Sequence, residues 1–81
     1  MDTRDSAKAV ERQLDRELGL VADAIAMVVS GGSRRVVVGG LLLGDLVLEP
    51  ARRLAAGSGV RIVPHWTADE SGVDIAVERP E

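Results

Sequence analysis

Hydrophobic residues recur at helical spacing through the first thirty positions. Six of them follow one another at intervals of four and three: Val10, Leu14, Leu18, Val21, Ile25 and Val28. This spacing places them on one stripe of an α-helix. Asp5 or Ser6 can cap its start through a side-chain oxygen, and the glycines at 31–32 can end it without backbone strain. The pattern predicts one long amphipathic helix over residues 5–30.

The next apolar segment has the pattern of a strand. Residues 35–38 carry three consecutive valines with no polar alternation, which is typical of a strand buried on both faces, such as a central parallel strand. Gly39 and Gly40 follow directly, and we expect the strand to end there.

Residues 42–56 allow two interpretations. As a helix, they have a clean polar stripe made of Asp45, Glu49, Arg52 and Arg53. As a hairpin, they would turn at residues 44–45, and Pro50 would start a short helix. A proline inside a helix costs about 3 kcal/mol, which favours the hairpin. The polar stripe favours the helix, and we choose a helix that is kinked at Pro50.

The remaining pattern predicts two strands. Residues 60–63 are branched and apolar except for Arg61, with Trp66 as the furthest limit of that strand, and residues 73–78 are rich in branched side chains. A right-handed crossover would pair the 35–38 and 60–63 strands in parallel, and the last strand would add an antiparallel edge. The expected fold is therefore a single α/β domain over 1–81. It has two layers, the order helix-strand-helix-strand-strand and a three-stranded mixed sheet.

Composition favours an interaction role for this domain. The chain has 81 residues and no cysteine, so it buries only roughly 60–65% of its unfolded surface and has no disulfide. His65 is the only histidine, and we expect neither a metal nor another cofactor. Small domains without disulfides or a bound metal depend on tight packing or on oligomerisation. We therefore expect a homo-oligomer or a protein partner.

The chain has no sign of a membrane segment. Its apolar runs are far shorter than the ~20 residues that span a bilayer. Its first residues, MDTRDSAKAVERQ, are polar and of mixed charge, unlike a signal peptide. We expect a cytoplasmic protein with no membrane partner.

Charge is uneven along the chain. Residues 31–63 hold five arginines and two acids, between two acidic flanks. The segments could simply neutralise one another. Alternatively, Arg34, Arg35, Arg52 and Arg53 could hold a phosphate, because the planar guanidinium fork suits it. The sequence pI near 5.1 argues against general nucleic-acid binding, which depends on a basic surface.

Catalytic patterns are weak. The sequence shows no nucleophile with a base at a recognisable spacing, and the adjacent acids Asp69 and Glu70 are typical of a solvated turn. The backbone N–H groups of Gly39 and Gly40 could approach an anion at a following helix N-terminus, although neither common phosphate-loop motif is present. We expect no enzyme activity.

Several short segments occur in the order found in a known family. They are Leu18-Gly19, the valine-rich Val36 to Gly40, Leu46 to Pro50, Val60 to Pro64 and the acidic turn Asp69 to Gly72. Over roughly residues 14–73 the chain resembles the C-terminal part of the ROK family, which contains sugar kinases and sugar-responsive repressors.

This resemblance implies the actin/hexokinase-like ATPase fold and a nucleotide ligand. Gly39 and Gly40 would match the glycines that lie against the adenosine of bound ATP. The family's phosphate-binding lobe, catalytic aspartate and zinc motif have no counterpart here, and phosphoryl transfer needs such groups assembled together.

Three hypotheses follow from the sequence. The preferred one is a non-enzymatic interaction or regulatory module that self-associates or binds a protein partner. The second is a ROK-like nucleotide-binding remnant without phosphotransfer. The third is a small nucleic-acid binder, because the element order is similar to the Alba fold and to the C-terminal fold of a translation initiation factor. The acidic pI and the single aromatic residue, Trp66, make nucleic acid an unlikely partner.

Overall fold

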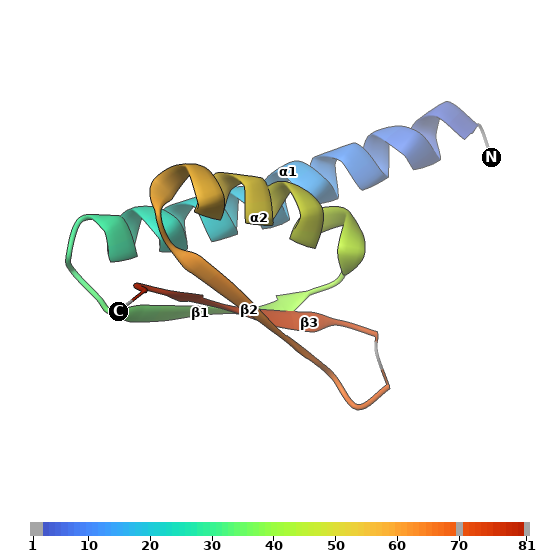
Figure 1. Ribbon diagram of the computed structural model, residues 1–81. Coiled ribbons are helices and arrows are strands. Elements are labelled where there is room, and N and C mark those ends of the chain that lie inside the picture. The colour runs from blue at the N-terminus through green and yellow to red at the C-terminus, as the bar shows by residue number, and fades with distance from the viewer. Residues whose placement is uncertain (1–2, 70, 81) are drawn as a thin grey trace.

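The computed structural model describes residues 3–69 and 71–80. It contains two helices and three strands in the expected order (Figure 1). They are α1 (Thr3–Val29), β1 (Arg35–Leu41), α2 (Asp45–Ser58), β2 (Arg61–Trp66) and β3 (Val73–Glu78). The α/β class and the order helix-strand-helix-strand-strand are confirmed.

The sheet is not mixed, as the sequence had suggested, but wholly antiparallel. Its strand order is β1-β3-β2, and β3 pairs antiparallel with both neighbours. The predicted parallel pairing of β1 with β2 is therefore wrong, and so is the edge position of β3. The physical reason lies in burial: Ile75 and Ala76, which point to opposite faces of β3, are both fully buried, as a central strand requires.

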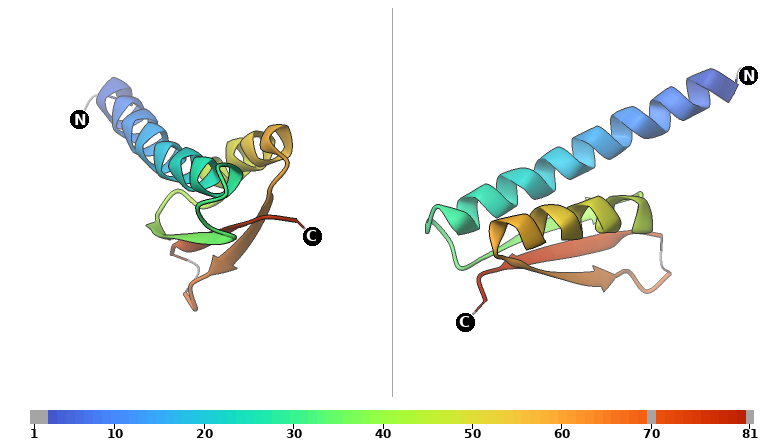
Figure 2. Two further views of the ribbon diagram at one scale, coloured as in Figure 1. Left: turned by 90° about the vertical axis from the view of Figure 1, so that its left-hand side faces the viewer. Right: turned by 45° about the horizontal axis from the view of Figure 1, so that its top comes forward.

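Both helices cover one face of this sheet. α1 packs over β1 and β3, whereas α2 packs over β2 (Figure 2). The core lies between the helix layer and the sheet. Its fully buried members come from every element except β2: Val21 and Val28, Leu41, Val47 and Ala51, and Val73, Ile75 and Val77.

The long first helix is confirmed, and its N-terminal half extends beyond the sheet (Figure 2). The apolar stripe continues onto this half, where Val10 is exposed, whereas Val21 in the other half is fully buried. Gly31, with a φ of 84°, lies just beyond the last turn, as a left-handed cap requires.

β1 differs from its sequence-based description in two ways. It lies at the edge of the sheet, and its Val37 side chain is 52% exposed, so it is not buried on both faces. It also continues past Gly39 and Gly40 to Leu41, with an irregular register between Val38 and Leu41. Gly40 has a φ of 73°, and this irregularity lets the strand continue where we expected it to end.

α2 confirms the helical interpretation of residues 42–56, although the helix begins only at Asp45. Pro50 lies inside it. The expected pair of Glu49 and Arg53, four residues apart, forms an ion pair of 3.2 Å on the exposed surface.

Replacing Pro50 should stabilise the domain. A proline at this position removes the N–H that would bond to Leu46 O and crowds that carbonyl. We expect Pro50→Ala to raise the free energy of unfolding by about 1–2 kcal/mol, because the gain in the helix exceeds the entropy that proline removes from the unfolded chain. Urea denaturation measures this change, with Pro80→Ala outside the helices as a control. A lower urea midpoint for Pro50→Ala would contradict the expectation.

Candidate functional site

The helices leave one face of the sheet uncovered (Figure 2). Val73, Ile75 and Val77 of β3 pack into the core beneath the helices. Because side chains alternate along a strand, Asp74, Ala76 and Glu78 lie on the other side, which we call the open face. Strand register then gives two rows across this face: Arg35, Glu78 and Arg61 at one end, and Val37, Ala76 and Val63 in the middle.

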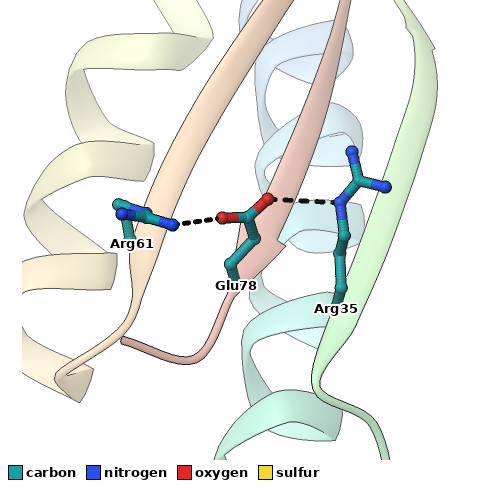
Figure 3. A network of polar contacts seen from close by, with 3 residues as sticks. All are labelled: Arg35, Arg61 and Glu78. Atoms are coloured by element: carbon teal, nitrogen blue, oxygen red, sulfur yellow. Dashed lines mark hydrogen bonds and ion pairs between the residues drawn. The ribbon is translucent and has the colours of Figure 1, made fainter. Parts of the chain in front are cut away.

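The end row of the open face is an ion-pair network (Figure 3). The Glu78 carboxylate lies 3.2 Å from Arg35 Nε and 2.7 Å from Arg61 Nη2. The hydrogen bond from Arg61, together with the charges of both arginines, lowers the pKa of Glu78. The three strand ends are thereby linked through one carboxylate.

Two further arginines join this end of the sheet. Arg34 and Arg79 lie next to each other, since the Arg79 N–H donates to Arg34 O at 3.0 Å. The Arg79 guanidinium also donates to Val28 O at the end of α1, at 2.9 Å. Together with Glu78 and Pro80, the four arginines line a solvent-open hollow of about 680 Å³. We call Arg34, Arg35, Arg61 and Arg79 the arginine cluster.

The structure separates the four arginines that the sequence had grouped. Arg34 and Arg35 belong to the arginine cluster, whereas Arg52 and Arg53 lie on α2 beside Asp45 and Glu49. The cluster instead gains Arg61 and Arg79, which sequence reasoning did not select. Arg61 is the first residue of β2 and pairs with Glu78, and Arg79 directly follows Glu78. A correct strand order would therefore have placed both of them near Arg34 and Arg35.

The Gly39-Gly40 segment does not open onto a helix N-terminus. It lies inside β1, and the Gly40 N–H donates to Asp74 Oδ1 at 3.0 Å. Two amides of the connection before α2 are also bonded within the chain, because Leu42 N–H and Leu43 N–H both donate to Glu17 Oε1 at 2.8 and 3.1 Å. Carboxylates of the chain therefore occupy three backbone donors in this region, those of Gly40, Leu42 and Leu43.

Glu17 is the residue that sequence reasoning missed. It is 2% exposed and is the only buried charged residue among those described. Besides the two loop amides, it accepts a hydrogen bond from Gln13 Nε2 at 2.6 Å. A signal was present in the sequence, because Glu17 falls within the apolar stripe of α1, between Leu14 and Val21. Its carboxylate fixes the connection between β1 and α2 against α1.

The outer edge of β1 is open for pairing. Because the Arg79 N–H bonds to Arg34 O, alternation along the ladder turns the backbone groups of Val36 and Val38 toward β3. The N–H and C=O groups of Arg35 and Val37 therefore point away from the sheet, where the described chain provides no further strand.

The outer edge of β2 is different. The same alternation turns Arg61, Val63 and His65 toward β3, so Pro64 contributes to the outer edge. Proline has no N–H to offer there, and a proline on an edge strand prevents pairing with a further strand. The two edges of this sheet are therefore unequal: β1 is open, and β2 is blocked.

Exposed apolar side chains lie beside the open edge. Ala22, Ala26 and Val29 line the groove of α1 that faces α2, so Leu20 and Met27 lie on the opposite flank, above β1. They are 47% and 52% exposed and seven residues apart, which places them on one line of the helix. We call Val37, Leu20, Met27 and the outward backbone groups of β1 the β1-edge surface.

The remaining candidate groups are accounted for by local structure. Asp69 accepts hydrogen bonds from Thr67 Oγ1 and Ser71 Oγ, both at 2.7 Å. These bonds lower its pKa to about 2, so its carboxyl group is ionised at neutral pH. Glu70, the other half of that acidic pair, lies outside the described residues. No group of three metal-binding side chains occurs within residues 3–69 and 71–80.

Neither α1 nor α2, within the described part of the chain, is long and apolar enough to cross a bilayer.

Comparisons with known proteins return no match. No family model matches the chain, and neither the curated proteins nor the solved structures contain a match. The resemblance to the ROK family therefore stays a prediction.

Proposed function

We propose that this chain is a non-enzymatic, self-associating domain that pairs with a second copy through its β1-edge surface. The observation that carries the proposal is the inequality of the two sheet edges. β1 offers outward backbone groups without a strand partner in the described chain, beside exposed apolar side chains, whereas Pro64 blocks β2. An edge of this kind is a template for another strand.

A second copy of the chain fits this surface by symmetry. Two β1 strands that run antiparallel about a two-fold axis at Val37 would exchange hydrogen bonds through the outward groups of Val37. Arg35 would then lie opposite Gly39 of the other copy, so no like charges would face each other along the paired strands. On the open face, the apolar row of Val37, Ala76 and Val63 would continue into its equivalent.

The helix layer supports the same two-fold axis. Val28 lies near the start of β1, because its carbonyl accepts a hydrogen bond from Arg79, whose N–H bonds to Arg34. Glu17 lies near the end of β1, because it accepts a hydrogen bond from Leu42. Val37 is therefore level with the part of α1 between Leu20 and Met27. A two-fold axis at Val37 would place Leu20 of each copy against Met27 of the other, which is the reciprocal contact of an isologous dimer.

The assembly would bury surface that a single copy leaves in water. A standard interface removes about 800 Å² from each partner, roughly a seventh of the 5549 Å² that this domain exposes. Self-association also suits a domain that is too small for a large core.

The proposal is tested with two matched substitutions. Val37→Lys places a charge at the two-fold axis, whereas Val63→Lys places the same charge on the same face at the other edge of the sheet. Sedimentation velocity of both variants and the parent chain, over a hundredfold range of concentration, measures the association. We expect Val37→Lys to weaken association by at least about tenfold, since like charges would meet across the axis, and Val63→Lys to change it little.

A chain that stays monomeric at every concentration would contradict the proposal. So would equal weakening by the two variants, because it would move the contact from the β1 edge to the open face as a whole. Nucleotide binding at Gly39 and Gly40, and nucleic-acid binding, stay predictions, and no observation of the described chain favours either over self-association.

A further inference from the structure

We propose that the arginine cluster is a binding site for a small phosphate-bearing anion. The site shares Arg35 with the β1-edge surface, which uses the backbone of that residue, whereas the site uses its side chain. The inference does not depend on self-association. It rests on the excess of positive charge and of guanidinium N–H donors that the strand ends bring to one hollow.

Charge in the hollow is unbalanced. Four arginines line it, and Glu78 is the acidic residue among the described residues that does so. Arginine remains protonated at all relevant pH values, and the pKa of Glu78 is lowered, so the carboxylate also stays charged at neutral pH. The described residues of the hollow therefore carry three positive charges in excess.

Hydrogen-bond donors are also left over. Each guanidinium has five N–H donors. Arg35 uses its Nε for Glu78, which leaves both of its Nη groups outside the network (Figure 3). Arg61 uses one Nη, and Arg79 uses one Nη for Val28 O. Arg34 forms no ion pair within the described part of the chain.

Structural roles account for only part of this cluster. Glu78 ties β1 to β2 with two arginines, and Arg79 bonds the last turn of α1. Neither role needs Arg34, and neither uses the remaining donors of Arg35. Repulsion among four like charges opposes their assembly, and a bound anion would remove it.

The chemistry of the donors favours phosphate. Planar guanidinium forks bind phosphate oxygens in pairs, and an anion with more than one charge matches the excess of three. The hollow of about 680 Å³ is within the range of sites for small molecules. The overall acidic charge of the chain, −3, favours a small ligand over an extended polyanion, because the rest of the surface would repel the latter.

Inorganic pyrophosphate is a suitable probe. We would titrate it into the isotopically labelled chain at constant ionic strength and follow the arginine Nε–H signals by NMR. Saturable shifts are expected for Arg34, Arg35, Arg61 and Arg79, and not for Arg52 or Arg53, which serve as internal controls on α2.

Two substitutions with opposite expected effects sharpen the test. Arg34→Gln removes a donor that has no structural partner among the described residues, and it should weaken binding by at least about fivefold. Glu78→Gln removes the competing carboxylate with little change of shape, and it should tighten binding by about threefold or more. Arg52→Gln is the matched control and should leave the affinity unchanged.

Several results would overturn the inference. The first is a pyrophosphate titration that does not saturate, and the second is a response that sodium chloride at equal ionic strength reproduces. Either result would mean an adventitious ion only. The third is equal weakening of pyrophosphate binding by Arg34→Gln and Arg52→Gln, because the loss of affinity would then follow from overall charge alone. The fourth is weaker binding in a folded Glu78→Gln variant. Amide spectra of each variant establish that it is folded.

Discussion

Glu17→Leu is expected to unfold most of this domain under conditions in which the parent chain is stable. The substitution leaves the N–H groups of Leu42 and Leu43 without their acceptor in a part-buried site. Each buried donor without a partner costs about 1–3 kcal/mol, so we expect a loss of about 2–5 kcal/mol in the free energy of unfolding. Urea denaturation followed by far-UV circular dichroism measures it.

The control for this prediction is Glu11→Leu, which makes the same change at an exposed position of the same helix. It should alter stability by no more than about 0.5 kcal/mol. Glu17→Gln should fall between the two, because the amide keeps one oxygen acceptor. Equal midpoints for Glu17→Leu and Glu11→Leu would show that the carboxylate does not hold the β1–α2 connection.

Gly44→Ala is the second substitution with a large expected effect. Gly44 precedes α2 with φ 55° and ψ −120°, a conformation that side-chain-bearing residues adopt only with strain. A Cβ there would also lie 3.1 Å from the Trp66 ring. Strain of this kind costs about 1–3 kcal/mol, and the contact adds to it. We expect a loss of about 2–4 kcal/mol, measured by thermal and urea unfolding.

Gly57→Ala gives the matched control. Gly57 lies within α2, and an added Cβ meets no atom within 4 Å. Alanine is favoured over glycine in a helix by up to about 1 kcal/mol, so this variant should be slightly more stable than the parent. The account of the turn would be wrong if Gly44→Ala also proved neutral or stabilising.

Local patterns in the sequence were sufficient to predict the elements. The apolar stripe from Val10 to Val28 predicted α1, and the polar stripe around Glu49 and Arg53 correctly outweighed Pro50 in α2. These signals depend on spacing within one element, which the chain carries directly.

Strand order could not be predicted in the same way. A parallel crossover between β1 and β2 satisfies the same local patterns as the insertion of β3 between them. The decisive signal was the composition of β3, whose Ile75 and Ala76 point to opposite faces and are both apolar. The expected parallel pairing of β1 with β2 left only an edge position for β3, although two adjacent apolar residues in its middle favour a central strand.

The candidate sites depend on that strand order. Arg34 and Arg35 are adjacent in the sequence, but Arg61 and Arg79 join them only because β3 lies between β1 and β2, so that the strand ends meet at one end of the sheet. The edge position of β1 could not be predicted from the sequence either, because a run of valines is also typical of a central strand. Only the register shows that Val37 lies at the edge, with its backbone N–H directed outward.

Amide hydrogen exchange at Arg35 and Val37, as a function of protein concentration, tests self-association through the β1 edge most directly. These amides face solvent in a single copy and would bond to the second copy in the pair, so their exchange should slow as concentration rises. Ile62 and Trp66, on the blocked outer edge of β2, should exchange at unchanged rates. If the exchange rates of Arg35 and Val37 did not change with protein concentration, the account would be contradicted.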